Sequence, residues 1–391
     1  MKPTRSLSTF STWLIALVAP IILQDRSDLV RWLTTMAAPG LLFWASGQNR
    51  SPTNVTNQFI LAAITFSTIS TFVAFRLAGS QLVFGLCLAL GLSGAFRAGY
   101  TRSDQEIQSL LKSLVLVAQI ASVIALIEWT RKAPLIVFTA YARPTPFRSS
   151  AFLGHPLVLS TFLGAVLVAL LATAVSTRKR LAGTVGTLLL LSAGALTTLS
   201  RSIIVVLAGT ACFLAYFLQR SRIRGRLKLA AVVTLFAMLG LFGSAKLLGP
   251  AFYDRLQDIN AVSQAGRLEN FRFVTDRLSL GTAFVGNGPN AVLYAIRRGE
   301  RFVSTLTSLD NQYLTLLFDF GLLGLLALLA PLVTAVRSAR ARTAQTLPFL
   351  AMTVALSIGS AFFEVLYWPP LMLLFGLSLG ASCRRSDPET V

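Results

Sequence analysis

Seven polar side chains in this sequence have types and positions that could do chemistry. Each lies beside or inside an apolar stretch, in a chain of 391 residues of which only 13% are charged. The arginines could bind an anion, and the carboxylates and the single histidine could accept a proton. In chain order the seven are Arg148, His155, Arg201, Arg267, Asp310, Asn311 and Asp319.

Three of these residues are arginines at places where an anion could bind. Arg201 lies in a hairpin with almost no loop between two apolar runs, where a charged side chain is costly unless it is paired or hydrated. Its planar guanidinium suits a diphosphate group, although it could instead extend to the membrane interface. Arg267 begins an expected amphipathic helix, whose N-terminus also favours anions. For Arg148 and Arg267 the alternative is a hydrated surface position.

The proton-accepting side chains have two interpretations each. His155 precedes an apolar run and could be a general base or a hydrogen-bond donor, or it could be structural. Asp310 could accept a proton from a sugar hydroxyl, but Asp310 and Asn311 are also preferred helix N-caps. Asp319 lies deeper in an apolar run, where an unpaired carboxylate is expensive. The simplest partner for Asp319 is an external arginine, and Glu364 is another possible partner.

Several classes of site are excluded by what the sequence lacks. It has one histidine, three scattered cysteines and no acidic cluster with metal-ligand spacing, so we expect no metal and no cofactor. No glycine-rich nucleotide loop precedes a Lys-Ser/Thr pair. The formal net charge of +20 comes from short basic clusters between apolar runs, which does not resemble a nucleic-acid-binding surface.

The elements that position these residues are apolar runs long enough to cross a bilayer as helices. Hydrophobic residues make up 54% of the chain, and about 17–25 apolar residues span the hydrocarbon core. We therefore expect an all-α, polytopic transmembrane bundle, as a single membrane domain over residues 1–391. The expected spans are 9–23, 30–47, 58–77, 80–96, 110–127, 156–176, 182–199, 202–218, 229–247, 312–336, 346–362 and 366–382.

The basic clusters predict the orientation of this bundle. They fall on alternate connections, as in Arg178-Lys179-Arg180, which the positive-inside rule assigns to the cytoplasm. Both termini are then cytoplasmic, and the first span is expected to be an anchor because no cleavage site follows it. The long segment 248–311 is external, with seven basic and six acidic residues.

The external segment has a predicted internal structure of its own. From Gly266 to Leu278 the apolar residues recur at helical spacing, which predicts an amphipathic helix that Gly281 ends. A turn-rich break, "VGNGPN", occupies 285–290, and a second short helix is expected from Ala291 to Arg301. The residues of the expected apolar stripe are Leu268, Phe271, Val274 and Leu278, with Arg267 and Asn270 on a more polar side.

In their order and sidedness, four segments resemble the O-antigen ligase and Wzy-type polysaccharide polymerase superfamily of integral membrane glycosyltransferases. They are "RSSAFLGHP" before a span, "TTLSRS" at a tight hairpin, "AGRLENFRF" with "VGNGPN" in one long external segment, and "DNQYLTLLFDFGLLGL" re-entering the membrane. They cover about a sixth of the chain. The resemblance implies a GT-C-like membrane fold in a bacterial cytoplasmic membrane, with the active site on the external side.

The resemblance also implies partners and roles. Arg201 and Arg267 would engage the diphosphate of a polyprenyl-linked glycan donor, and Asp310 would act as the base for a glycan acceptor. Arg148, His155, Asn311 and Asp319 would bind substrate. Where ligases of this superfamily have histidine-asparagine, this chain has Asp310-Asn311, a departure that favours a polymerase over a ligase. A polymerase could also bind a separate chain-length regulator.

The resemblance further implies inverting transfer without a metal, because the diphosphate is already a good leaving group and arginines can neutralise its charge. The rival interpretation is a small-solute transporter, for instance of bicarbonate, since twelve spans also suit that class. Transporters usually have two interrupted spans in matching positions of the two halves of the chain, and this sequence has no such pair. A non-catalytic scaffold in an envelope assembly is a third possibility.

Overall fold

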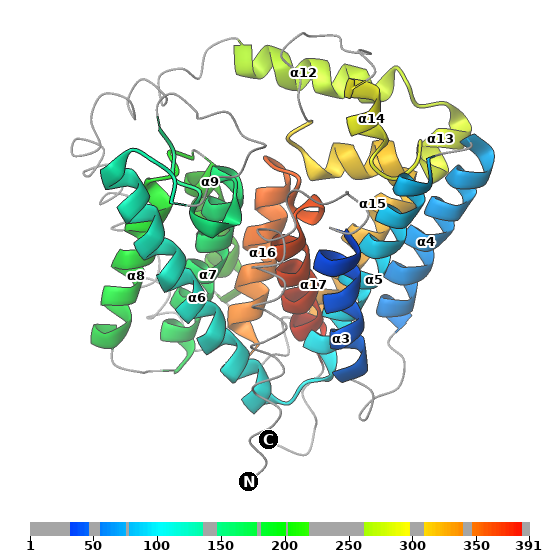
Figure 1. Cartoon of the computed structure of the whole chain (residues 1–391). Helices are drawn as coiled ribbons and strands as arrows, with labels where there is room; N and C mark the ends of the chain where they lie inside the picture. The colour runs from blue at the N-terminus through cyan, green and yellow to red at the C-terminus, as the bar shows by residue number, and fades with distance from the viewer. Residues whose placement is uncertain are drawn as a thin grey trace.

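The protein is described here from a computed structural model, and its described residues are 32–46, 55–75, 78–135, 147–177, 181–200, 202–218, 262–297, 309–338 and 346–384. Over these ranges the chain forms thirteen α-helices and no strand, as an all-α fold requires. Figure 1 shows the helices arranged as a bundle, with α12, α13 and α14 at one end.

The helices have the following bounds. They are α3 (Ala38–Ser46), which continues a π-helical turn at Leu33–Ala37, then α4 (Val55–Phe75), α5 (Gly79–Thr101), α6 (Asp104–Arg131), α7 (Pro156–Thr177), α8 (Leu181–Leu196), α9 (Ser202–Leu218), α12 (Val262–Thr275), α13 (Leu280–Val285), α14 (Ala291–Arg297), α15 (Gln312–Ser338), α16 (Leu347–Ser360) and α17 (Pro369–Cys383). Two short 3₁₀ turns, η2 (Ala151–Leu153) and η4 (Val365–Tyr367), precede α7 and α17.

Five of these helices, α4, α5, α6, α7 and α15, are long and apolar enough to cross a membrane. The other helices that coincide with expected spans, namely α3, α8, α9, α16 and α17, are apolar but shorter. The expected spans at 9–23 and 229–247 lie outside the described residues. The chain is therefore a multi-pass helical membrane protein in its described part.

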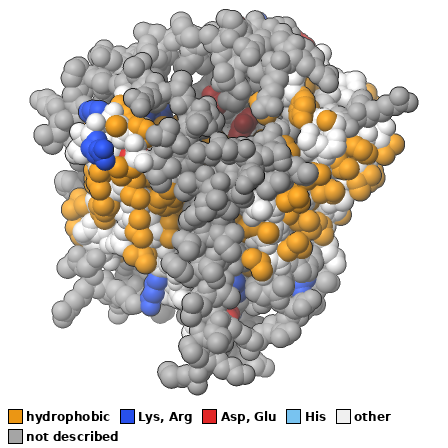
Figure 2. All heavy atoms as spheres, viewed as in Figure 1, with side chains coloured by type: hydrophobic (Ala, Val, Ile, Leu, Met, Phe, Trp, Pro, Cys, Tyr) orange, Lys and Arg blue, Asp and Glu red, His pale blue; other side chains and the backbone are white. Residues whose placement is uncertain are grey.

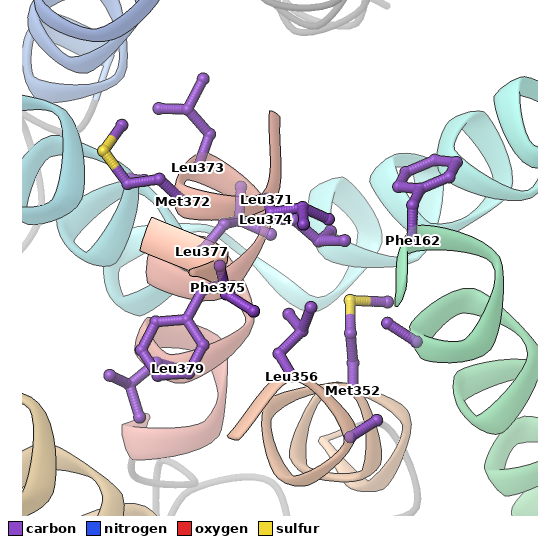
Figure 3. Close-up of a cluster of buried hydrophobic side chains, with 14 of the residues drawn as sticks. Phe162, Met352, Leu356, Leu371, Met372, Leu373, Leu374, Phe375, Leu377 and Leu379 are labelled. Carbon is purple, nitrogen blue, oxygen red and sulfur yellow. The ribbon is translucent and has the colours of Figure 1, made fainter. Parts of the chain in front are cut away.

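The centre of the bundle is the contact between α5 and α17, which depends on small residues. A Cβ atom on Gly99 would lie 2.1 Å from the Leu377 carbonyl oxygen, and one on Gly380 would lie 1.9 Å from that of Phe96. Glycine at these two places lets the helix backbones touch, which is a common way to pack helices in membranes. Figure 3 shows the apolar side chains of α16 and α17 filling the space beside this contact, with Phe162 of α7 nearby.

The outer faces of several helices expose large apolar side chains in stripes. On α15 these are Leu322, Leu326, Leu329 and Val333, and on α6 they are Leu116, Ile120, Val123 and Ile127. Both sets recur every three or four residues, so each forms one face of its helix. Figure 2 shows hydrophobic side chains over the middle height of the molecule on the sides of α4 and of α6, with Lys and Arg above and below them on the side of α6. Such a belt fits contact with lipid.

Local sequence explains the start of α6. The Ser103 hydroxyl accepts a hydrogen bond from the Glu106 backbone N–H, and the Glu106 carboxylate accepts one from the Ser103 N–H at 2.9 Å. This reciprocal capping box satisfies two amides that the helix cannot. The helix then continues to Arg131, four residues beyond the expected span.

The segment that is expected to be external differs from its predicted internal structure. Its first described helix is α12, in which Phe271 is 52% exposed, whereas Asn270, Phe273 and Val274 are buried. The expected apolar stripe is therefore wrong at Phe271, because Phe273 packs against Phe318 of α15 with ring centroids 5.3 Å apart and turns the helix. Gly281 does not end this helix: it lies inside α13.

Candidate functional site

Arg148 joins two of the polar segments. Its Nε atom donates a hydrogen bond to the Thr198 carbonyl at 2.7 Å, and the next N–H, that of Ser149, donates to the Thr197 carbonyl at 3.1 Å. Thr197 and Thr198 belong to the turn between α8 and α9, where Ser200 and Ser202 share a hydrogen bond of 2.7 Å. Arg201 stands between these serines but lies outside the described residues. The structure thus brings Arg148 to the turn that carries Arg201.

A buried glutamate holds the segment around Arg148 in place. The Glu128 carboxylate accepts hydrogen bonds from the backbone N–H groups of Leu135, Ser150 and Ala151 at 2.9–3.0 Å. The Glu128 side chain is fully buried. Glu128 is not among the residues predicted from the sequence, although a carboxylate near the end of an apolar run is a signal of such a role.

His155 lies in a group of aromatic rings. Its imidazole stacks on Phe363 and packs against Trp368, with both centroid distances 5.5 Å. Its Nδ1 atom accepts a hydrogen bond from the Leu157 N–H at 3.2 Å. Burial, and then the charge of Arg148, lower the pKa of His155 to about 4. The ring is therefore neutral at pH 7, which favours a packing role over proton transfer.

Asp310 and Asn311 have different positions at the start of α15. The Asn311 side-chain oxygen accepts hydrogen bonds from the Tyr313 and Leu314 N–H groups at 3.0 and 3.2 Å, so Asn311 is the helix cap. Asp310 is exposed, with a left-handed φ of 47°, a conformation that aspartate adopts more readily than most residues other than glycine. The N-cap interpretation is confirmed for Asn311, which leaves the Asp310 carboxylate at the surface.

Glu364 interacts with residues at the start of α15, next to Asp310. The Thr315 hydroxyl donates to its carboxylate at 2.9 Å. Burial raises the pKa of Glu364 to about 7; the Thr315 hydrogen bond opposes this rise, and the charge of Asp310 adds to it. A carboxylate with such a pKa can take up or release a proton near neutrality. From the sequence, Glu364 was predicted only as a possible partner of Asp319.

Asp319 is fully buried, and both of its carboxylate oxygens accept hydrogen bonds. One carboxylate oxygen accepts from the Val292 N–H at 3.0 Å and the other from the Tyr367 hydroxyl. No arginine in the described part of the chain is a partner of this carboxylate, and Arg201 and the Arg267 side chain lie outside that part, so the expected salt bridge stays a prediction. Asp319 holds α14 and η4 against α15.

The "VGNGPN" turn docks on a break in α15. At Gly321 the helix has non-helical angles, φ 63° and ψ −159°, and kinks. The Asn287 N–H and side-chain amide donate to the Phe318 carbonyl at 2.8 and 3.1 Å, and the Gly288 N–H donates to the Asp319 carbonyl at 2.9 Å. The turn therefore supplies the donors that the interrupted helix lacks.

Helix α12 is tied to the residue before Asp310. The Asn270 side-chain amide donates to the Leu309 carbonyl at 2.8 Å, which places the end of α12 over the start of α15. Arg267 lies one turn earlier in α12, but its side chain is outside the described part of the structure. The expectation that Asn270 lies on a polar face is wrong, because Asn270 is buried in this contact.

Within the described ranges, no group of three or more histidine, cysteine, aspartate or glutamate side chains could hold a metal ion. The chain matches no model of a known protein family, and no curated protein matches it.

Proposed function

We propose that this protein is a membrane glycosyltransferase that moves a glycan from a polyprenyl diphosphate to an acceptor saccharide on the external face of the bilayer. The supporting observation is a set of interactions at one end of the bundle. Arg148 donates to Thr198 and its charge acts on His155, His155 stacks on Phe363 next to Glu364, and hydrogen bonds join Thr315 to Glu364 and Asn270 to Leu309. Five segments of the chain, distant in sequence, take part in it.

The proposed reaction needs a cationic group for the diphosphate and a base for the acceptor. The acceptor hydroxyl attacks the anomeric carbon, and the bond from that carbon to the diphosphate oxygen breaks. Polyprenyl diphosphate leaves with the bonding electrons, and the configuration at the anomeric carbon inverts. Asp310, exposed at the start of α15, takes the hydroxyl proton, and Glu364 is a second acceptor for it.

The proposal gives the arginines the task of stabilising the leaving group. Arg201 and Arg267 bind the diphosphate, and Arg148 fixes the turn that carries Arg201. Fixed guanidinium groups that face developing charge supply a large part of catalysis in many enzymes. No metal ion is required in this scheme.

The test uses the full chain purified in lipid nanodiscs with a polyprenyl-diphosphate oligosaccharide. We expect longer glycans and released polyprenyl diphosphate. In the new glycosidic bond, the configuration at the anomeric carbon is inverted relative to the bond between that carbon and the diphosphate of the donor. An Asp310→Asn variant that turns over at the wild-type rate would remove the proposed base. The absence of any glycan product with several donors and acceptors would reject the proposal.

A small-solute transporter is the second candidate, and one observation favours it. A transmembrane helix broken at Gly321, beside the buried carboxylate of Asp319, resembles the interrupted helices that bind substrate in transporters. Proteoliposomes that accumulate a labelled solute such as bicarbonate, and form no glycan product, would support this alternative.

A further inference from the structure

The turn at 285–290 lies well below the outer ends of the helices around it. The Ser67 hydroxyl of α4 donates to the Val285 carbonyl, and Ser67 is eight residues before the end of α4. That is about 12 Å along the helix axis. On α5, a Cβ atom at Gly85 would lie 2.6 Å from Pro289, and Gly85 is six residues, or about 9 Å, from the start of α5. The contacts with α4 and with α5 therefore place the turn at a similar depth below the outer ends of these two helices.

Most polar backbone groups of this turn have hydrogen-bond partners within the protein, as backbone at membrane depth requires. Ser67 supplies a donor to Val285, and the Gln81 side-chain amide donates to the Pro289 carbonyl at 3.0 Å. The N–H groups of Asn287 and Gly288 reach carbonyl oxygens at the kink of α15. These backbone groups therefore do not need water as a hydrogen-bond partner, as those of a surface loop do.

The short helix α13, which leads into this turn, has a self-satisfied start. The Ser279 hydroxyl accepts from the Thr282 N–H at 3.3 Å, and the Thr282 hydroxyl accepts from the Ser279 N–H at 2.8 Å. The six residues of α13 span about 9 Å. Because that length is less than the depth of Val285 below the end of α4, Leu280 remains within the height of α4 at any tilt of α13.

The outward face of α13 is apolar. Leu280 is 96% exposed and Phe284 is 51% exposed, next to helices whose own outward faces are apolar. Phe66, Ile69 and Val73 form the exposed stripe of α4, and α13 packs beside α4 and α15. Leu280 and Phe284 therefore extend the apolar belt formed by these two spans, which Figure 2 shows on the side of α4.

We infer that residues 279–289 form a re-entrant element in the outer leaflet, with Leu280 and Phe284 in contact with lipid acyl chains. The partner of this surface is the bilayer itself. Burying two such side chains in hydrocarbon stabilises the element, which then anchors the kink of α15 to the membrane. The expected external segment 248–311 thus returns partway into the membrane before α15 begins.

This inference depends on the five apolar spans and not on glycosyl transfer, so each can fail without the other. The test places a nitroxide spin label on single cysteines at Leu280→Cys and Phe284→Cys, in the full chain reconstituted in phosphatidylcholine liposomes. Cys212 is exposed and is first replaced by serine, whereas Cys87 and Cys383 are buried. Collision of each label with oxygen, which enters lipid, is compared with collision with a water-soluble nickel chelate.

Two labelled positions calibrate the experiment. Val73 lies on the apolar face of α4 and is 72% exposed, so a label at Val73→Cys gives the value for lipid. Asp276 is exposed just after α12, so a label at Asp276→Cys gives the value for water. We expect labels at 280 and 284 to match position 73, with high oxygen and low nickel accessibility. Labels at 280 and 284 that match position 276 would overturn the inference. The two positions are read separately, so one poorly folding variant leaves the other as the test.

Discussion

The Nε atom of Arg148 donates to the backbone carbonyl of Thr198 at 2.7 Å and so joins two segments that lie 50 residues apart. One of these segments leads into α7 through His155, and the other leads into α9 through Arg201. The bond fixes the relative position of two chain segments that periodicity alone cannot relate. In the proposed function it determines where the Arg201 side chain can reach.

The first prediction concerns this bond. Arg148→Ala lowers the rate of glycan transfer by about 100-fold, because a misplaced ligand of the leaving group costs that order of rate. Arg148→Lys remains impaired, since lysine keeps the charge but lacks the Nε donor. The initial rate of donor consumption measures both variants. A lysine variant with the wild-type rate would show that the bond to Thr198 has no role.

The second prediction concerns the buried carboxylate at the kink. Asp319→Ala leaves the Val292 N–H and the Tyr367 hydroxyl without their acceptor, and each such buried group costs about 1–3 kcal/mol. Asp319→Asn keeps an acceptor oxygen and loses less. The midpoint of thermal unfolding in detergent should fall in that order, while Asp276→Ala, at an exposed site, leaves it unchanged. An unchanged midpoint for Asp319→Ala would contradict the assigned contacts.

The third prediction compares two glycines five residues apart. A Cβ atom at Gly286 would lie 2.1 Å from the Asp319 carbonyl oxygen, and its φ of 86° is unfavourable for alanine. Gly286→Ala therefore separates the turn from α15 and lowers the unfolding midpoint. At Gly281 a Cβ atom meets nothing within 4 Å, so Gly281→Ala inside α13 is neutral or stabilising by up to about 1 kcal/mol. Equal midpoints for the two variants would disprove the docking of the turn.

The fourth prediction is a pH dependence from Glu364. Burial raises the pKa of Glu364 from 4.5 to about 7, so the folded protein keeps a proton that the unfolded chain releases. The contribution of this group to stability is complete below pH 4.5 and decreases as the pH rises towards about 7. Unfolding midpoints measured across this range should fall more steeply for the wild type than for Glu364→Gln. Parallel curves for the two proteins would refute the shift.

Much of the fold could be predicted because apolar runs of membrane length leave a helix as the main choice. The start of α15 was also predictable, since Asn311 is a preferred cap before an apolar run. The kink in α15 was not. Around Gly321 the sequence is apolar except for Asp319, and the break depends on a turn more than thirty residues earlier.

Several residues of the candidate site could be predicted from the sequence, but most of their contacts could not. Isolated polar residues beside apolar runs identified Arg148, Asp310 and Asp319, because such positions are costly without a purpose. The partner of Asp319 is Tyr367, 48 residues away, and no local pattern relates the two. Phe271 has the helical spacing of a buried residue but is exposed, because the long-range contact of Phe273 with Phe318 sets the rotation of α12.

The most direct measurement is the rate at which the purified chain consumes a polyprenyl-diphosphate oligosaccharide in the presence of a chelator. We predict that the wild type lengthens the glycan. Arg201→Ala combined with Arg267→Ala reduces the rate by 100-fold or more. Loss of one donor that stabilises the developing charge lowers kcat in other enzymes by about 100- to 1,000-fold. Arg272→Ala, exposed on the same helix as Arg267, retains the wild-type rate. Unchanged glycan output from the double variant would contradict the account.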